Sequence, residues 1–119
     1  MTHMTSNDAK VAMAIGAISH FFGSKYGQMN VDRLFKTIGI TNLSQGNKSE
    51  KISGVLTGYY KTDRSLFATC IETLIQNHEL TPGDIEKLRT LTLRLDFDIK
   101  DEKLVPSLSK EIVLSGNKP

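Results

Sequence analysis

The sequence consists of polar stretches between runs in which apolar residues recur every three or four positions, the spacing of an amphipathic helix. Five such runs are present, with their apolar residues over 11–22, 31–38, 52–59, 66–75 and 85–95. Residues that favour helix caps stand ahead of these runs, and glycines follow the first two. The pattern therefore predicts an all-α fold, a single compact domain of five or six short helices.

Capping residues locate the first two helices. The first is expected over residues 8–22, with Asn7 as its N-cap and Gly23 as its stop. The second should begin after Asn30 and end at Gly39, which supplies a left-handed residue. The apolar stripes of these two helices are Val11, Ile15, Ile18 and Phe22, then Val31, Leu34, Phe35 and Ile38.

The third helix should start at Asn47, because Glu50 three residues later completes a variant of the capping box. A turn at Lys61 and Thr62 is then expected to lead to Asp63, the cap of the fourth helix. The expected buried face of the third helix is Ile52, Val55, Leu56 and Tyr59.

The fourth helix has the widest apolar face, which places it at the domain centre. That face is Leu66, Phe67, Cys70, Ile71, Leu74 and Ile75. Thr81, Pro82 and Asp84 give a clear start for the fifth helix, since proline suits the first helical position and aspartate favours the positive end of the dipole.

The helical pattern weakens after residue 95. Residues 96–102 alternate apolar and acidic side chains and would suit a short extended piece with Phe97 and Ile99 turned inward. Residues 104–113 suit either a last short helix beginning near Pro106 or an irregular segment. We therefore expect a flexible leader at 1–7, the helical domain at 8–114, and a tail or linker at 115–119.

Length and composition narrow the class of protein. A length of 119 residues corresponds to one domain with a real core. The single cysteine, Cys70, has no partner within the sequence for a disulfide, as in most intracellular domains. No apolar run reaches the roughly 18 residues of a membrane span, and the start lacks the features of a secretory signal. We expect a soluble, cytoplasmic protein without a membrane role.

Positive charge concentrates in the middle of the sequence, where residues 24–64 contain seven basic and three acidic side chains. Lysines 48 and 51 are three residues apart and should share a helix face. This basic 36–64 surface is either a solvated face or a contact for a partner or a nucleic-acid backbone. Its candidate contact residues are Lys36, Lys48, Ser49, Lys51, Lys61 and Arg64.

Residues 46–49 contain the Gly, Lys and Ser of a nucleotide-binding phosphate loop, but not its spacing. An asparagine separates the glycine from the lysine, and position 41 is threonine where that loop needs a glycine. The amide groups at the start of the third helix could still hold a lone phosphate.

The other residues that could take part in catalysis or metal binding are better explained by structural roles. The three histidines, His3, His20 and His78, have no cysteine or histidine partner at zinc-ligand spacing. The acidic residues between 96 and 102 lack the glycine and terminal glutamate of a calcium loop. Cys70 lies on an apolar face. We therefore expect no catalytic residues, no metal site and no cofactor, and the protein is not expected to be an enzyme.

Several segments resemble a known family. In order, these are FFG, VDRLFKTIGI, GNKSEKISGVLTGYYKTD, a leucine-rich helix and LTPGDIEKLRTLTLRLDFDIKDEKLVP. Together they resemble the small helical N-terminal domains of abortive-infection-type antiphage defence proteins. The resemblance implies a non-catalytic front domain, fused to an effector or standing alone.

A narrower resemblance covers LFKTIGI and GNKSEKISGVL, which are similar to the helix-link-helix of the DNA-binding SAP module. Gly46 and Lys48 match that pattern, whereas Val55 stands where the module usually has a basic residue. We therefore expect a non-catalytic helical binding or adaptor module, with a protein partner or a fused effector domain. The alternative is a DNA- or RNA-backbone-binding domain that uses the basic 36–64 surface.

Overall fold

A computed structural model of the 119-residue protein describes residues 6–25, 30–41, 43 and 45–107. These residues form five helices and then two strands. Their bounds are α1 Ser6–Lys25, α2 Val31–Lys36, α3 Lys48–Thr62, α4 Arg64–Gln76, α5 Pro82–Leu93, β1 Phe97–Lys100 and β2 Lys103–Pro106. The prediction of one compact, mainly helical domain is confirmed, and the prediction of an all-α fold is wrong.

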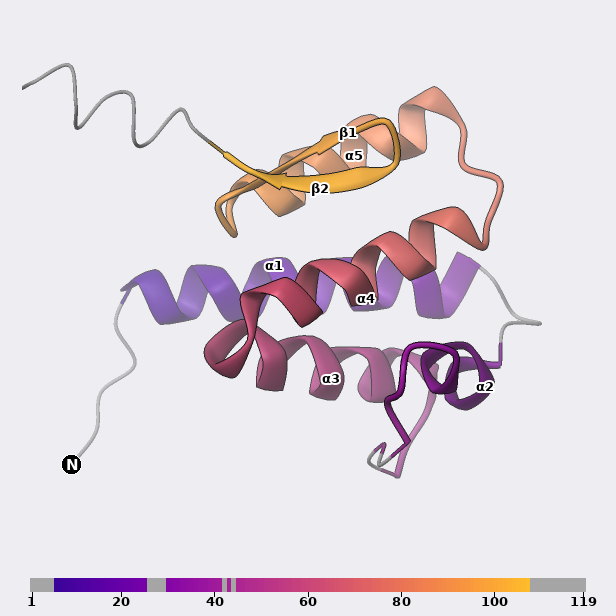
Figure 1. The fold of residues 1–119 in the computed structure, drawn as a ribbon. Helices are drawn as coiled ribbons and strands as arrows, with labels where there is room; N and C mark the ends of the chain where they lie inside the picture. The colour runs from indigo at the N-terminus through magenta and orange to yellow at the C-terminus, as the bar shows by residue number, and fades with distance from the viewer. Residues whose placement is uncertain (1–5, 26–29, 42, 44, 108–119) are drawn as a thin grey trace, which may run out of the picture.

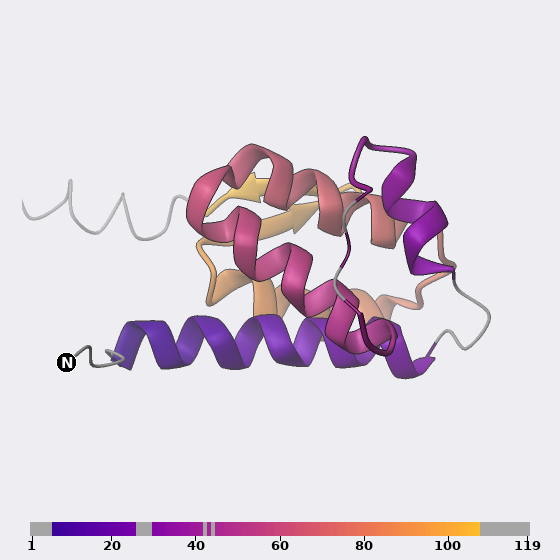
Figure 2. The same cartoon turned by 90° about the horizontal axis from the view of Figure 1, so that it is seen from below.

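The long helix α1 runs along one side of the molecule (Figure 2). It packs against α3 and α5, and α4 packs against α3 (Figure 1). The two strands form a hairpin over α4 and α5, with β1 against α5 and β2 against α4. The short helix α2 lies at one end of this arrangement, where it contacts α3 and α4.

One continuous apolar core joins these elements. Among the described residues, α1 and α4 each contribute five buried apolar side chains to it, so the wide apolar face of the fourth helix is buried as predicted. Its buried side chains are Phe67, Cys70, Ile71, Thr73, Leu74 and Ile75. Because Phe67 lies 5.0 Å from Tyr60 and 5.6 Å from Phe97, measured between ring centroids, aromatic contacts connect α4 to α3 and to β1.

The predicted helix starts are confirmed at α2, α3, α4 and α5, whereas α1 begins at Ser6 and so includes the predicted cap Asn7. The side chains of Asn30 and Asp63 accept hydrogen bonds from backbone N–H groups three residues later. Asn47 does the same and forms a complete capping box with Glu50. Thr81 forms a second capping box with Asp84. These caps are local interactions, which is why a reading of the sequence finds them.

The prediction that Gly23 stops the first helix is wrong, because α1 continues through it to Lys25. A Cβ atom at this position would lie 2.9 Å from the backbone nitrogen of Ser49. Glycine is therefore needed here for the close approach of α1 to α3, and not for a left-handed turn. Gly39, in contrast, has φ +86° and ends the turn after α2, as predicted.

Two details of the predicted third helix also need correction. The predicted turn at Lys61 and Thr62 is absent, because both residues belong to the last turn of α3, and Asp63 alone separates α3 from α4. Tyr60 is buried and its hydroxyl donates to the carbonyl oxygen of Leu95 at 3.4 Å, whereas the predicted core residue Tyr59 is half-buried.

The all-α prediction fails at the β-hairpin. The expected extended piece is confirmed, since Phe97 and Ile99 are buried on β1. The alternative of a helix near Pro106 is wrong for the residues of β2, and residues 108–119 lie outside the described part of the protein. Asp101 and Glu102 connect the strands with φ of 52° and 64°, the left-handed geometry of a tight hairpin turn. Asparagine and glycine usually provide this geometry, so the sequence has no turn signal at this point.

Carboxylates satisfy two strand N–H groups of this hairpin. The N–H of Ile99 donates to Asp98 Oδ1 at 2.7 Å, and the N–H of Leu104 donates to Glu72 Oε2 at 2.8 Å. Unpaired edge groups would favour pairing with another polypeptide, and these two N–H groups are already bonded. In the described ranges, no helix has both the length and the apolar character needed to cross a bilayer.

Candidate binding site

The six predicted contact residues lie at two separate places. Lys36 is in the last turn of α2, and Lys48, Ser49 and Lys51 are in the first turn of α3. Lys61 is in the last turn of α3, so it lies about 20 Å from Lys48 along the helix axis at 1.5 Å rise per residue. The structure does not bring the basic 36–64 surface together as one patch.

At the far end of α3, the cationic residue that follows Lys61 is engaged within the fold. Arg64 Nε donates to the carbonyl oxygen of Tyr60, and the guanidinium carbon lies 3.6 Å from the centroid of the Tyr60 ring. This cation–π contact covers the ring. Burial raises the pKa of the Tyr60 hydroxyl, and the nearby Arg64 charge opposes part of that rise. Arg64 therefore has a structural role at the junction of α3 and α4.

Near α2 the charged groups are closer together. Lys51 Nζ lies 2.8 Å from Asp32 Oδ1, which ties α3 to α2. Ser49 is half-buried and lies against Gly23 of α1, so helix packing already occupies its side chain. Residues 31–51 contain four basic and two acidic side chains, and both acids have partners, Lys51 for Asp32 and the N–H of Asn47 for Glu50.

The Glu50 carboxylate also bears on the predicted phosphate contact. Its Oε1 accepts the backbone N–H of Asn47 at 2.9 Å, while Asn47 Oδ1 accepts the N–H of Glu50 at 2.9 Å. A negative group thus already occupies the start of α3, where a phosphate would have to bind. This contact disfavours a second anion at that helix end.

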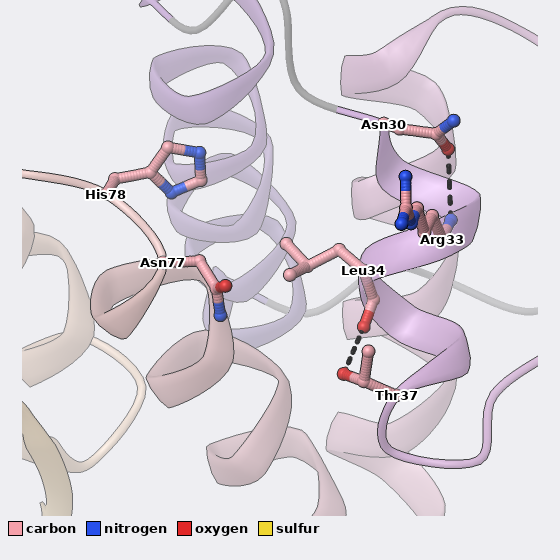
Figure 3. Close-up of a pocket in the computed structure, with 6 residues that line it drawn as sticks. All are labelled: Asn30, Arg33, Leu34, Thr37, Asn77 and His78. Atoms are coloured by element: carbon pink, nitrogen blue, oxygen red, sulfur yellow. Dashed lines mark hydrogen bonds between the residues drawn. The ribbon is translucent and has the colours of Figure 1, made fainter.

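We define the Arg33–Lys36 face as the two cations that α2 exposes three residues apart. Across residues 6–25, 30–41, 43 and 45–107, neither side chain has an ion-pair partner. Arg33 also lines a pocket of about 290 Å³ between α2 and the C-terminal end of α4 (Figure 3). The residues that line the pocket are Asn30, Arg33, Leu34, Thr37, Asn77 and His78.

One face of α2 and its flanking residues form one side of the pocket, at positions i, i+3, i+4 and i+7 from Asn30. Leu34 is half-buried, and its side chain points from α2 towards Asn77 (Figure 3). His78 lies beyond it, with Nδ1 at 2.5 Å from the carbonyl oxygen of Leu74 and its ring 5.8 Å from that of Phe22. Because a carbonyl oxygen can only accept, Nδ1 carries the hydrogen in this contact.

Sequence reasoning does not identify this pocket. In the sequence, Arg33 adds only to the charge of the middle segment, and Leu34 belongs to the expected buried stripe of the second helix. The spacing of the α2 residues is visible in the sequence, but nothing local indicates that Asn77 and His78 would face them. The pocket depends on where α2 docks against the end of α4.

The other predicted chemistry can be located directly. His20 is exposed near the end of α1, and His3 lies outside the described residues. Burial raises the pKa of the Cys70 thiol to about 12, which suits a packing role. Among the residues with described positions, no three His, Cys, Asp or Glu side chains gather where they could hold a metal ion.

No protein-family model matches the sequence, and comparisons with curated proteins and with solved structures return no match. The resemblances to abortive-infection-type N-terminal domains and to the SAP module therefore stay predictions.

Proposed function

We propose that this protein is a non-catalytic binding module that recruits or senses a protein partner through the Arg33–Lys36 face. One observation carries the proposal. Two exposed cations share one face of α2, without a carboxylate partner in the described part of the protein, and one of them lines a pocket. Like charges this close repel one another slightly, so an acidic partner that neutralises them would gain energy.

The surroundings of α2 support the same function. Val31 and Phe35 anchor α2 in the core, and the capping box at Asn47 defines the start of α3. A contact surface on rigid elements loses little conformational entropy when it binds. A partner would therefore meet a preformed surface.

Binding of a DNA or RNA backbone is the alternative function, and we rank it second. Successive phosphates need a continuous row of cations. Lys51 is paired with Asp32, and Arg64 stacks on Tyr60 at the far end of α3. The remaining cations leave a short contact that suits one or two acidic groups better than a strand.

Affinity capture from the cells that produce the protein tests the proposal. Lys36→Glu reverses a charge on the Arg33–Lys36 face, and Lys61→Glu makes the same change in the last turn of α3, as a matched control. We expect a specific set of proteins to be retained by the wild type and by Lys61→Glu and lost by Lys36→Glu. Equal capture by all three proteins would reject the proposal.

Nuclease treatment of the extract distinguishes the alternative. If capture disappears with nuclease, and if the purified protein binds duplex or single-stranded DNA with an affinity that falls steeply with salt, the nucleic-acid function replaces the protein-binding one.

A further inference from the structure

The pocket beside α2 has an uneven supply of hydrogen-bonding groups. The Arg33 guanidinium offers five N–H donors in a planar fork. Asn30 uses its Oδ1 to accept the backbone N–H of Arg33 at 3.0 Å, and its side chain is directed away from Asn77 (Figure 3). Thr37 already donates its hydroxyl hydrogen to the carbonyl oxygen of Leu34, so Arg33 is the donor on this side of the pocket.

The opposite wall provides an acceptor. Asn77 donates from Nδ2 to the carbonyl oxygen of Thr73 at 2.8 Å, which leaves its Oδ1 to accept a hydrogen bond. Leu34 extends from α2 towards Asn77 and gives the pocket an apolar part (Figure 3). A matching ligand therefore has an anionic acceptor at one end, a short aliphatic part and an N–H donor.

The charge of the lining limits the anion. Of the described residues around the pocket, Arg33 is the one with a permanent charge. A carboxylate carries one negative charge and can bind a guanidinium through two parallel hydrogen bonds. A phosphate monoester carries about 1.5–2 negative charges near neutral pH and would leave part of its charge unbalanced here.

We infer that the pocket between α2 and the C-terminal end of α4 binds one carboxylate of the partner protein, paired with Arg33, with the aliphatic part of the partner residue against Leu34. The inference rests on the proposed function, because it takes the partner to be a protein. The carboxylate belongs either to an acidic side chain or to the carboxyl terminus of the partner, and both present it beside a backbone N–H that Asn77 can accept.

Short peptides test this chemistry without knowledge of the partner. Acetyl-Gly-Glu-Gly-amide presents a carboxylate only on its glutamate, and acetyl-Gly-Gly-Leu presents only a terminal one. Acetyl-Gly-Gln-Gly-amide is the uncharged control, and inorganic phosphate is the competing anion. Binding is followed by ¹H–¹⁵N NMR on the full-length protein, at the side-chain signals of Arg33, Asn30 and Asn77.

We expect saturable shifts at these three side chains with at least one carboxylate peptide, at a dissociation constant on the order of 1–10 mM. The peptide that binds identifies the source of the carboxylate. The glutamine peptide should cause no shift at these side chains. Arg33→Gln should weaken binding by at least roughly tenfold.

Arg94→Gln is the matched control, because Arg94 is an exposed arginine at the C-cap of α5, away from the pocket lining. It should bind the peptide as the wild type does. Because both arginines are exposed, neither change should unfold the protein, and circular dichroism checks this.

Three results would overturn the inference: no saturable shift with either carboxylate peptide, equal binding by Arg33→Gln, or tighter binding of inorganic phosphate than of the peptides. If the peptides fail while Lys36→Glu still abolishes partner capture, the proposed function stands and the carboxylate pocket does not. If the peptides bind but Lys36→Glu captures the same proteins as the wild type, the pocket is a carboxylate site and the proposed recruitment through the Arg33–Lys36 face is rejected.

Discussion

Replacing Gly23 by alanine tests the close packing of α1 against α3, on which the position of the α3 start depends. The added methyl group would stand 2.9 Å from the backbone nitrogen of Ser49 and 3.1 Å from its Cα atom. Both are backbone atoms in the first turn of α3, so they cannot rotate away as a side chain does. The two helices would have to move apart by several tenths of an ångström.

Two opposing effects set the size of the change. Overpacking of this kind costs about 1–3 kcal/mol. Alanine in a helix interior is favoured over glycine by about 0.5–1 kcal/mol. We therefore expect Gly23→Ala to lower the free energy of unfolding by roughly 1–2 kcal/mol.

Gly16→Ala supplies a matched control in the same helix. A Cβ atom at Gly16 would meet nothing within 4 Å, so only the helix preference remains. This variant should gain about 0.5–1 kcal/mol in the free energy of unfolding. The same glycine-to-alanine change should thus lower the free energy of unfolding at Gly23 and raise it at Gly16.

Urea unfolding followed by circular dichroism measures both variants, and an unchanged dependence on urea concentration confirms that only stability has changed. Thermal unfolding should show the same order, at about 5 °C per kcal/mol for a protein of this size. If Gly23→Ala proves as stable as Gly16→Ala, the close approach of the two helices at Ser49 is refuted.

Three further predictions concern local interactions. Asn47→Ala should lower the free energy of unfolding by about 1 kcal/mol through loss of the α3 cap, and an unchanged urea midpoint would contradict this. The buried Cys70 thiol, its pKa raised to about 12 by burial, should react with a thiol reagent at pH 8 only as fast as the fold opens, so rapid labelling of the native protein would contradict its burial. A hydrogen bond from Arg89 lowers the pKa of Asp98, so the stability from this pair is present above the ordinary aspartate pKa of about 3.9 and is lost as the pH falls through the lowered one. Acid unfolding of Asp98→Asn should therefore be less dependent on pH below about 4, and identical acid curves would reject the role of the pair.

Sequence reasoning succeeded where the physical cause spans only a few residues. The capping box at Asn47 needs two side chains three positions apart, and both of its hydrogen bonds form as expected. The left-handed Gly39 is another example, because it follows directly from the end of α2. Such features appear in any fold that contains the helix.

Prediction from the sequence failed where the role of a residue depends on a segment far away in the sequence. Gly23 has the same position relative to its apolar stripe as many helix stops, and only the backbone of Ser49 beside it gives its reason. The hairpin was not predicted for a related reason, since Asp101 and Glu102 adopt a turn geometry that their residue types do not favour. Packing of β1 and β2 on α5 and α4 holds that turn in place.

The sequence by itself determined the five helices, most of their caps and many of the core residues, because helical periodicity and capping act within a few positions of one another. Only the tertiary structure decided how the charges are grouped. It paired Lys51 with Asp32, and it set Arg33 beside a pocket that α2 and α4 form together. These groupings arise from the packing of segments far apart in the sequence, and the periodicity of one helix holds no information about the neighbour against which it packs.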